Sequence, residues 1–219
     1  PLTAHAFVYS WKRALAPETA ADYAYQLYYI KNARPFNEGA LTDFDKVGVT
    51  AVDDDTLAVT LERPTPFFLF LTAFPTLQPV NRRCTEKYGD NWTKEGNIVS
   101  NGPFSLKGWK INQKIRLVKN PYYWDAEHVS INSIDVLTVE SANTAFNTYE
   151  TGCADLVSAI PMQLIDVLKN RSDFHTSTYL GTYFYRFNVT KPPFNDVRVR
   201  KVFVMAVNKE EIVKYVTRG

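Results

Sequence analysis

Side chains that could catalyse a reaction are few in this sequence and widely scattered. The three histidines, His5, His128 and His175, lie in unrelated contexts, and we expect each to face solvent or to bond to its neighbours. The sequence has no Gly-x-Ser-x-Gly elbow, no His-Glu-x-x-His pair, no phosphate-binding glycine loop and no dinucleotide fingerprint. Carboxylate pairs that hydrolyse glycans are set by the fold, and nothing in the spacing indicates one. We therefore predict no catalytic residues and no cofactor.

Two other groups of residues could bind a metal or form a covalent bond. Asp53, Asp54 and Asp55 are consecutive, but the glycine and glutamate of a calcium loop do not follow, so we interpret them as a turn. Cys84 and Cys153 lack the spacing of metal ligands. They could form a disulfide if the fold brought their Cα atoms within ~7 Å, and we favour two free thiols. The sequence thus predicts no metal site and leaves the redox compartment open.

Aromatic rings are the most abundant groups that could bind a ligand. The 219 residues include 13 Tyr, 14 Phe and 4 Trp. This share fits an aromatic-rich core, or a cleft lined with rings that combine large contact area with the polar hydroxyl of tyrosine. The 25 basic and 23 acidic residues are mixed along the chain, which gives no electrostatic footprint for nucleic acid or an anionic membrane.

The elements that must position these rings alternate between helix and strand. The length predicts one or two folded units. Apolar periodicity and capping residues predict helices at about 3–15, 19–31, 67–74, 82–88, 141–150, 161–169 and 209–217, and a loop at 34–43. Alternating patterns predict strands at 46–52, 56–62, 104–109, 114–119, 133–139, 154–157 and within 174–189. Such an alternation is typical of sheets covered by helices. The longest apolar run, 66–74, is far shorter than the ~20 residues that span a bilayer, and no signal peptide opens the chain.

The stretch 179–201 is the most informative part of the sequence. Its first half alternates aromatic with small or polar residues, which predicts a strand with two usable faces. Pro192 and Pro193 end the strand, because proline cannot donate to a sheet ladder. Asp196 is a candidate N-cap for a following helix, in which apolar residues recur at helical spacing up to Ala206. Asn208, with Glu211 three residues on, is the corresponding candidate for the helix 209–217.

Four separated segments of the chain resemble one known family, in the family's order. They are PLTA and the residues after it (1–8), DDDTLAVTL with PTPFF (53–68), NGPF with NPYYW (101–124), and PFNDVRVRK (193–201). The family is the extracellular solute-binding proteins of family 5, the periplasmic oligopeptide- and dipeptide-binding proteins of ABC importers. The run 86–99 brings the likeness closest to oligopeptide binders. Ala6 departs from the family pattern, which usually has Asp at that position.

The resemblance implies an α/β fold of the periplasmic binding protein-like II class, with two lobes of mixed sheets covered by helices, of which this chain is an incomplete part. It assigns 1–81 to an extra α+β domain, 82–180 to part of the first lobe, and 181–219 to the crossing strand and the start of the second lobe. Members of the family are longer, so we expect the chain to be a piece of a longer polypeptide.

The resemblance also implies a binding site. An extended oligopeptide would be held by its backbone in a cleft between the lobes, with hydrated pockets for its side chains. Tyr23 of the extra domain and Tyr179, Tyr183 and Phe184 of the crossing strand would line that cleft. Packing inside a core is the alternative role for each ring. Phe184 stands where close relatives carry Tyr, and Gly181 stands where they carry a cysteine, so their second-lobe disulfide cannot form here.

The partners implied are an oligopeptide ligand and the membrane permease subunits of an ABC importer, with no nucleic acid. We expect a monomer located in the periplasm or, as a lipoprotein, at the cell surface. Another solute bound by the same fold, such as a dipeptide, nickel, haem or a sugar, is the alternative. A hydrolase acting on peptides or glycans, and a remnant of the fold that binds nothing, are the remaining hypotheses.

Overall fold

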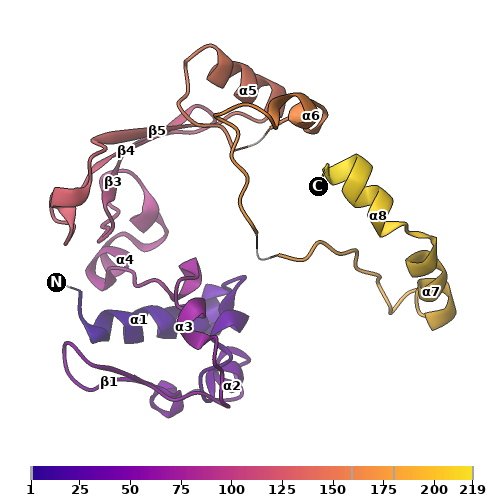
Figure 1. The fold of residues 1–219 in the computed structure, drawn as a ribbon. Helices are drawn as coiled ribbons and strands as arrows, with labels where there is room; N and C mark the ends of the chain where they lie inside the picture. Colours follow the sequence, from indigo (N-terminus) through magenta and orange to yellow (C-terminus); the bar gives the residue numbers. More distant parts are fainter. Residues whose placement is uncertain (1, 159, 180, 219) are drawn as a thin grey trace. The chain divides into compact units, whose positions relative to one another are not determined.

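The chain forms two compact units, Pro1–Thr138 and Val139–Gly219, called the first unit and the second unit below (Figure 1). The predicted division at 81 and 180 stays a prediction, and the observed boundary between compact units falls elsewhere, at 138/139.

The structure is a computed structural model that describes residues 2–158, 160–179 and 181–218. Pro1 of the first motif and Leu180 of the predicted crossing strand therefore lie outside the described residues. Within these ranges, no helix combines the length and the apolar character that crossing a bilayer requires.

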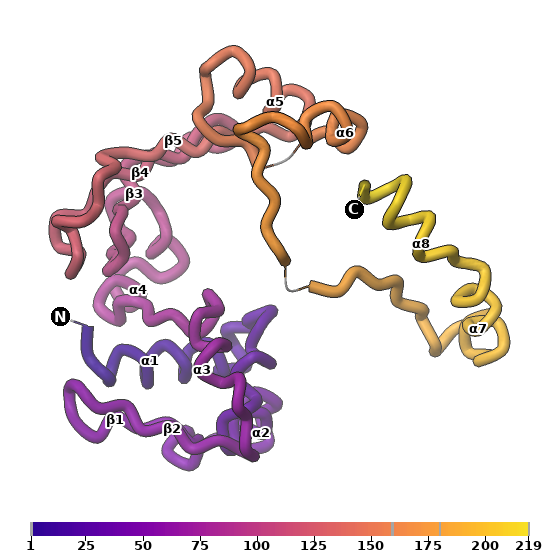
Figure 2. Tube along the Cα trace, in the orientation of Figure 1, coloured from indigo at the N-terminus to yellow at the C-terminus, as the bar shows by residue number. Residues whose placement is uncertain are grey.

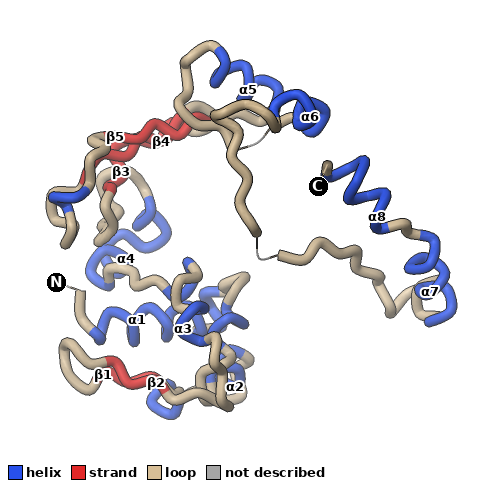
Figure 3. The backbone as a smooth tube through the Cα atoms, viewed as in Figure 1, coloured by secondary structure: helices blue, strands red, loops and turns tan. Residues whose placement is uncertain are grey.

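Groups of helices and groups of strands follow one another along the first unit (Figure 3). The α-helices are α1 (Ala4–Leu15), α2 (Ala33–Asn37), α3 (Phe68–Leu71) and α4 (Arg82–Tyr88). Short 3-10 helices include η2 (Ala24–Leu27), η4 (Pro75–Leu77) and η5 (Gly89–Thr93). The strands are β1 (Val49–Ala51), β2 (Leu57–Val59), β3 (Phe104–Lys110), β4 (Lys114–Lys119) and β5 (Ser133–Leu137). They make two antiparallel sheets, β1–β2 and β3–β4–β5.

The core of the first unit is built on the apolar face of α1. Trp11 and Leu15 are buried, and Phe7 and Val8 pack against the same cluster, as the helical spacing predicts. The indole N–H of Trp11 donates a hydrogen bond of 2.9 Å to the carbonyl oxygen of Leu77, which satisfies its one polar group. This bond fixes η4 against α1.

The β1–β2 hairpin closes at the aspartate run. The backbone N–H groups of Asp55 and Thr56 donate to Oδ1 of Asp53 at 2.9 and 2.7 Å. These bonds lower the pKa of the Asp53 carboxyl below its ordinary value, the bonding of Thr56 being the largest cause. The predicted turn is confirmed, and the two predicted strands are present but shorter than expected.

A close backbone crossing joins this hairpin to the chain before α2. The backbone N–H of Lys31 donates to the carbonyl oxygen of Thr60 at 3.0 Å. The backbone N–H of Gly48 donates to the carbonyl oxygen of Lys31 at 2.9 Å. A Cβ at Gly48 would collide with the carbonyl oxygen of Thr60 and lie 2.9 Å from Cβ of Lys31. Glycine is therefore required here for packing space.

The segments NGPF and NPYYW are bonded to each other beside the β3–β4–β5 sheet. Asn120 is buried, and its Nδ2 donates to the carbonyl oxygen of Gly102 at 2.8 Å. Its backbone N–H donates to Pro103 at 2.9 Å, and its Oδ1 accepts from the N–H of Tyr122 at 3.1 Å. One asparagine thus connects the two halves of this motif, at the end where β3 begins and β4 ends.

The second unit is helical. It contains α5 (Ala142–Glu150), η7 (Met162–Leu164), α6 (Ile165–Leu168), α7 (Val197–Ala206) and α8 (Lys209–Glu211), which continues as the π-helix η8 (Ile212–Thr217). The predicted caps are confirmed: Asp196 accepts from the N–H of Arg198, and Asn208 accepts from the N–H of Glu211. Phe187, Phe194 and Phe203 form a ring cluster, each within 5.8 Å of the others between ring centroids.

Two predictions for the first unit are wrong. The predicted helix 19–31 is instead a series of turns around η2, because Ala20 adopts the left-handed conformation (φ 47°) and interrupts helical geometry. The predicted loop 34–43 contains the end of α2, in which Pro35 occupies the first turn, where its missing N–H has no partner to lose.

Two predicted strands are also absent from the described residues. Neither 154–157 nor the described part of 174–189 forms a ladder, and Figure 3 draws the chain before α7 as loop. A strand exists only where a second strand accepts and donates its backbone hydrogen bonds. The aromatic alternation of 179–189 is therefore present without a sheet around it.

Candidate functional site

Tyr23 lies on the surface of the first unit, immediately before η2. The neighbouring Ala24 and Leu27 are buried, so they hold η2 against the core while the tyrosine side chain remains 49% exposed. Its ring packs edge-on against Phe74, with 5.2 Å between centroids, and lies 6.0 Å from Tyr25. The ring of Tyr23 is thus packed on one side and exposed on the other.

The other three predicted residues lie in the second unit, on the segment that leads to α7 (Figure 2). Tyr179 and Tyr183 are each 90% exposed and Phe184 is 59% exposed. The ring of Tyr183 packs edge-on against Tyr185, with 5.9 Å between centroids. The guanidinium of Arg186 lies over the ring of Phe184, 5.2 Å from its centroid.

These contacts join residues two apart along the chain, as side chains on one face of an extended backbone do. Tyr183 and Tyr185 make one pair, and Phe184 and Arg186 make the other. Tyr179 has a different neighbour: a Cβ at Gly181 would collide with its ring, so the glycine leaves space for it. The residues 183–186 therefore form two side-chain pairs, and the guanidinium of Arg186 belongs to the pair with Phe184.

Sequence reasoning missed Tyr25, Phe74, Tyr185 and Arg186 as candidate ligand contacts. Phe74 becomes a neighbour of Tyr23 only through the fold, and no sequence signal places it there. Arg186 could have been noticed, because it is the one charged residue between His175 and Lys191.

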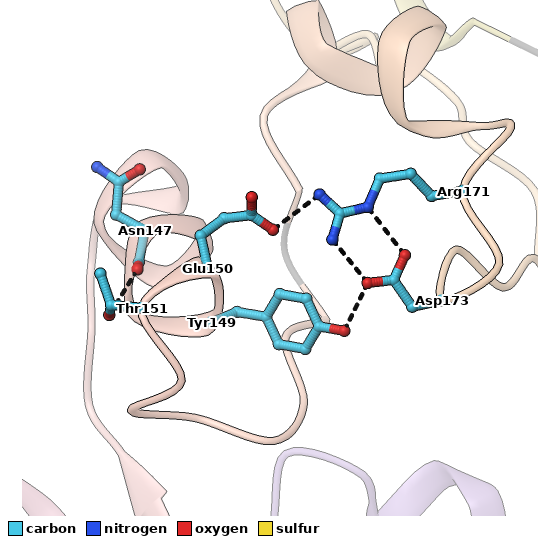
Figure 4. A network of polar contacts seen from close by, with 6 residues as sticks. All are labelled: Asn147, Tyr149, Glu150, Thr151, Arg171 and Asp173. Carbon is cyan, nitrogen blue, oxygen red and sulfur yellow. Dashed lines mark hydrogen bonds and ion pairs between the residues drawn. The ribbon is translucent and has the colours of Figure 1, made fainter.

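A polar network bonds residues 171–173, which precede the aromatic segment 179–189, to the end of α5 (Figure 4). Arg171 forms a forked ion pair with Asp173, with Nε 2.9 Å from Oδ1 and Nη2 2.7 Å from Oδ2. Its third nitrogen, Nη1, lies 2.8 Å from Oε1 of Glu150. The hydroxyl of Tyr149 donates to Oδ2 of Asp173 at 2.8 Å. The end of α5 is thereby bonded to the residues just before the aromatic segment.

Two carboxylates of this network share the one guanidinium of Arg171. Hydrogen bonds from Arg171, and then from Tyr149, hold the pKa of Asp173 far below its usual range. The same bonds to Asp173 and Glu150 raise the pKa of Arg171, and the bond to Asp173 raises the pKa of the Tyr149 hydroxyl. Because both carboxylates bond to Arg171, the network links the end of α5 to the backbone at 171–173.

Elsewhere in the described chain, groups that could bind a metal do not gather. No cluster of three or more His, Cys, Asp or Glu side chains occurs among the described residues. Both cysteines are free, as predicted. Cys84 is buried and its thiol donates to the carbonyl oxygen of Asn97 at 2.9 Å, whereas Cys153 is exposed.

Comparison with known proteins places this geometry in context. The family model described as bacterial extracellular solute-binding proteins, family 5 Middle, matches residues 1–219. The chain is 41% identical to the periplasmic oligopeptide-binding protein OppA of Escherichia coli, over 99% of the chain and 40% of that protein. Among solved structures, OppA of Burkholderia pseudomallei is similar with a TM-score of 0.93 and 33% identity, over 100% of this chain and 43% of that one.

The structure of Haemophilus influenzae OppA in complex with RPPGFSPFR is similar with a TM-score of 0.92 and 34% identity, again over 100% of this chain and 43% of that chain. The chain thus spans about two fifths of the length of the relatives it matches. These likenesses confirm the predicted fold class.

Proposed function

This chain belongs to the bacterial extracellular solute-binding proteins of family 5, and on that premise we propose that it is part of the peptide-binding component of an ABC importer. The bound molecule is an extended oligopeptide, held by its backbone between two lobes and released unchanged. The observation that carries the proposal is the match over the whole chain to oligopeptide-binding proteins, one of them solved with a peptide. The rings of Tyr179, Tyr183 and Phe184 are exposed in the described chain, which is compatible with this proposal.

In this proposal four rings contact the peptide: Tyr23 from the first unit, and Tyr179, Tyr183 and Phe184 from the second. Their exposed faces offer apolar contact to peptide side chains, and the tyrosine hydroxyls offer hydrogen bonds. The backbone N–H and C=O groups of the residues after Gly181 lie in no ladder of the described chain, and in this proposal they pair with an extended peptide.

The partners and location follow from the same proposal. A hinge motion closes the lobes over the peptide, and the closed form docks on the permease subunits of the importer. We infer a monomeric protein that works in the periplasm, or at the cell surface as a lipoprotein. In this proposal the bound peptide is not cleaved, whereas the alternative hydrolase would cleave it.

Calorimetry on the full-length protein with tri- to pentapeptides tests this proposal. We expect binding with measurable heat, and unchanged peptides when the mixture is afterwards separated by mass. Replacing both Tyr23 and Tyr179 by alanine should weaken binding by at least ~1 kcal/mol. Tyr122→Ala is the matched control, since that ring is exposed but outside the proposed site. New cleavage products would favour a hydrolase, and an unchanged affinity of the double variant would remove both rings from the site.

A further inference from the structure

The aromatic segment has an unbalanced charge. No acidic residue occurs between Asp173 and Asp196, whereas this stretch contains His175, Arg186 and Lys191. Arg186 is the cation at the centre of the stretch and the one that directly follows the exposed rings. A ligand that lies along the segment therefore meets a positive field with no carboxylate nearby in the sequence to offset it.

Arg186 also differs from the arginines on either side of it. Arg171 is forked onto Asp173, and Arg198 is 2.6 Å from a carboxylate oxygen of Asp196. In both cases an aspartate two residues away satisfies the guanidinium. Arg186 makes no ion pair with any carboxylate of the described residues, and the residues two away from it are Phe184 and Asn188. Its donors are therefore available to a partner from outside the segment.

The ring of Phe184 prepares Arg186 for such a partner. The guanidinium lies 5.2 Å from the ring centroid, and stacking of this kind uses the face of the planar group while its N–H edge stays free. The ring also reduces the number of orientations that the long side chain can adopt, so less entropy is lost when a ligand binds. A planar fork of donors held in this way matches a carboxylate better than any other common group in a peptide.

We propose that Arg186 binds a carboxylate of the ligand and makes this protein selective for peptides that carry one at the matching position. This inference rests on the proposed function, because it requires the segment to line the peptide site. Two carboxylates are chemically suitable: an Asp or Glu side chain, and the carboxyl terminus of the peptide. The guanidinium of Arg186 would repel a lysine or arginine side chain at the same peptide position. Peptides with a basic residue there should therefore bind more weakly.

The test uses the full-length protein and a set of tetra-alanine peptides in which one position at a time is Glu, Gln or Lys, each with a free or an amidated carboxyl terminus. Calorimetry should show that Glu at one position binds roughly ten- to a hundredfold more tightly than the isosteric Gln, as expected for a charge-assisted pair. If the terminal carboxylate is the partner, amidation should cause the loss instead. Either result supports the proposal and identifies the source of the carboxylate.

Three variants make the test specific to Arg186. Arg186→Glu should reverse the preference from Glu to Lys, and Arg186→Lys should keep its direction but reduce its size, because an ammonium cannot form the forked pair. Lys191→Glu introduces the same change of charge nearby and should leave the preference unchanged. Thermal unfolding of each variant confirms that it is folded.

The outcomes separate this inference from the proposed function. If none of the peptides binds, the proposed function fails. If peptides bind but Arg186→Glu leaves their ranking unchanged, the role of Arg186 is overturned and the proposed function stands. If Lys191→Glu shifts the ranking as much as Arg186→Glu does, selectivity comes from the general field of the segment and the specific pairing is overturned.

Discussion

The ion pairs between α5 and the residues 171–173 make stability depend on pH through identifiable side chains. The pKa of Asp173 in the folded protein lies below its unfolded value of about 4. Its stabilisation is therefore complete above that value and is lost as the pH falls towards the folded pKa. The pKa of Tyr149 is raised, so its contribution is present below about 10 and is lost as the pH rises further.

Asp173→Asn tests this dependence. The amide keeps a hydrogen-bond acceptor but removes the charge that Arg171 and Tyr149 surround. We expect the variant to unfold at a lower urea concentration than the parent at pH 7, and the difference to shrink steadily below about pH 4. A difference that stays constant from pH 7 to pH 3 would show that the charge of Asp173 does not stabilise the fold. Asp22→Asn, which changes an exposed carboxylate outside the described ion pairs, is the control.

Local sequence predicted the side chains that bond to their own neighbours. Asp53 in its turn, and Asp196 and Asn208 at their helix starts, act within three residues of themselves, so no knowledge of the fold was needed. The network of Tyr149 and Arg171 could not be predicted in this way. It joins positions more than twenty residues apart, and only the packing of the second unit brings them together.

At the scale of elements, Gly48 is the glycine of the first unit with the least space for a side chain. We expect Gly48→Ala to lower the free energy of unfolding by about 1–3 kcal/mol, because the added methyl must displace the backbone of Thr60 or Lys31. Urea unfolding of the 219-residue chain measures this loss. Gly108→Ala is the matched control: its Cβ would lie 3.8 Å from Arg116, an ordinary contact, so a similar loss there would refute the steric explanation.

The sequence predicted elements well where the structure depends on residues close together in the chain, as in a helix with one apolar face or a strand paired with the next strand. The helix Arg82–Tyr88 was predicted at its observed bounds, and the hairpin strands β3 and β4 lie where the alternation placed them. The structure of the segment 174–189 was not predicted correctly. Its alternating pattern indicates two different faces, but it does not indicate whether a partner strand is present.

At the scale of the whole molecule, the two units differ in how much they bury. Among the described residues of the second unit, only Pro161 and Leu168 are buried, whereas the first unit has a continuous core around α1. We predict that hydrogen exchange on the 219-residue chain will show strong amide protection in α1 and β4, and little in α7. Equal protection of α7 and α1 would contradict this.

Candidate site residues were predictable only through the likeness to a family, not from their own spacing. Nothing local distinguishes Tyr23 from Tyr28 or Tyr29, which pack partly buried against the core. The role of all four predicted rings remains a proposal for the binding experiments above.

The two cysteines differ in exposure, so the rates at which they are labelled can measure a local opening of the chain. A maleimide should modify Cys153 at the rate of a free thiol, because that side chain is exposed. Cys84 is buried and its thiol lies against the carbonyl oxygens of Trp92 and Asn97, so we expect it to react only when α4 moves away from residues 92–97. The slow phase of labelling therefore times that opening in the natural sequence, with no reporter group introduced, and a ligand that tightens this region should lengthen it.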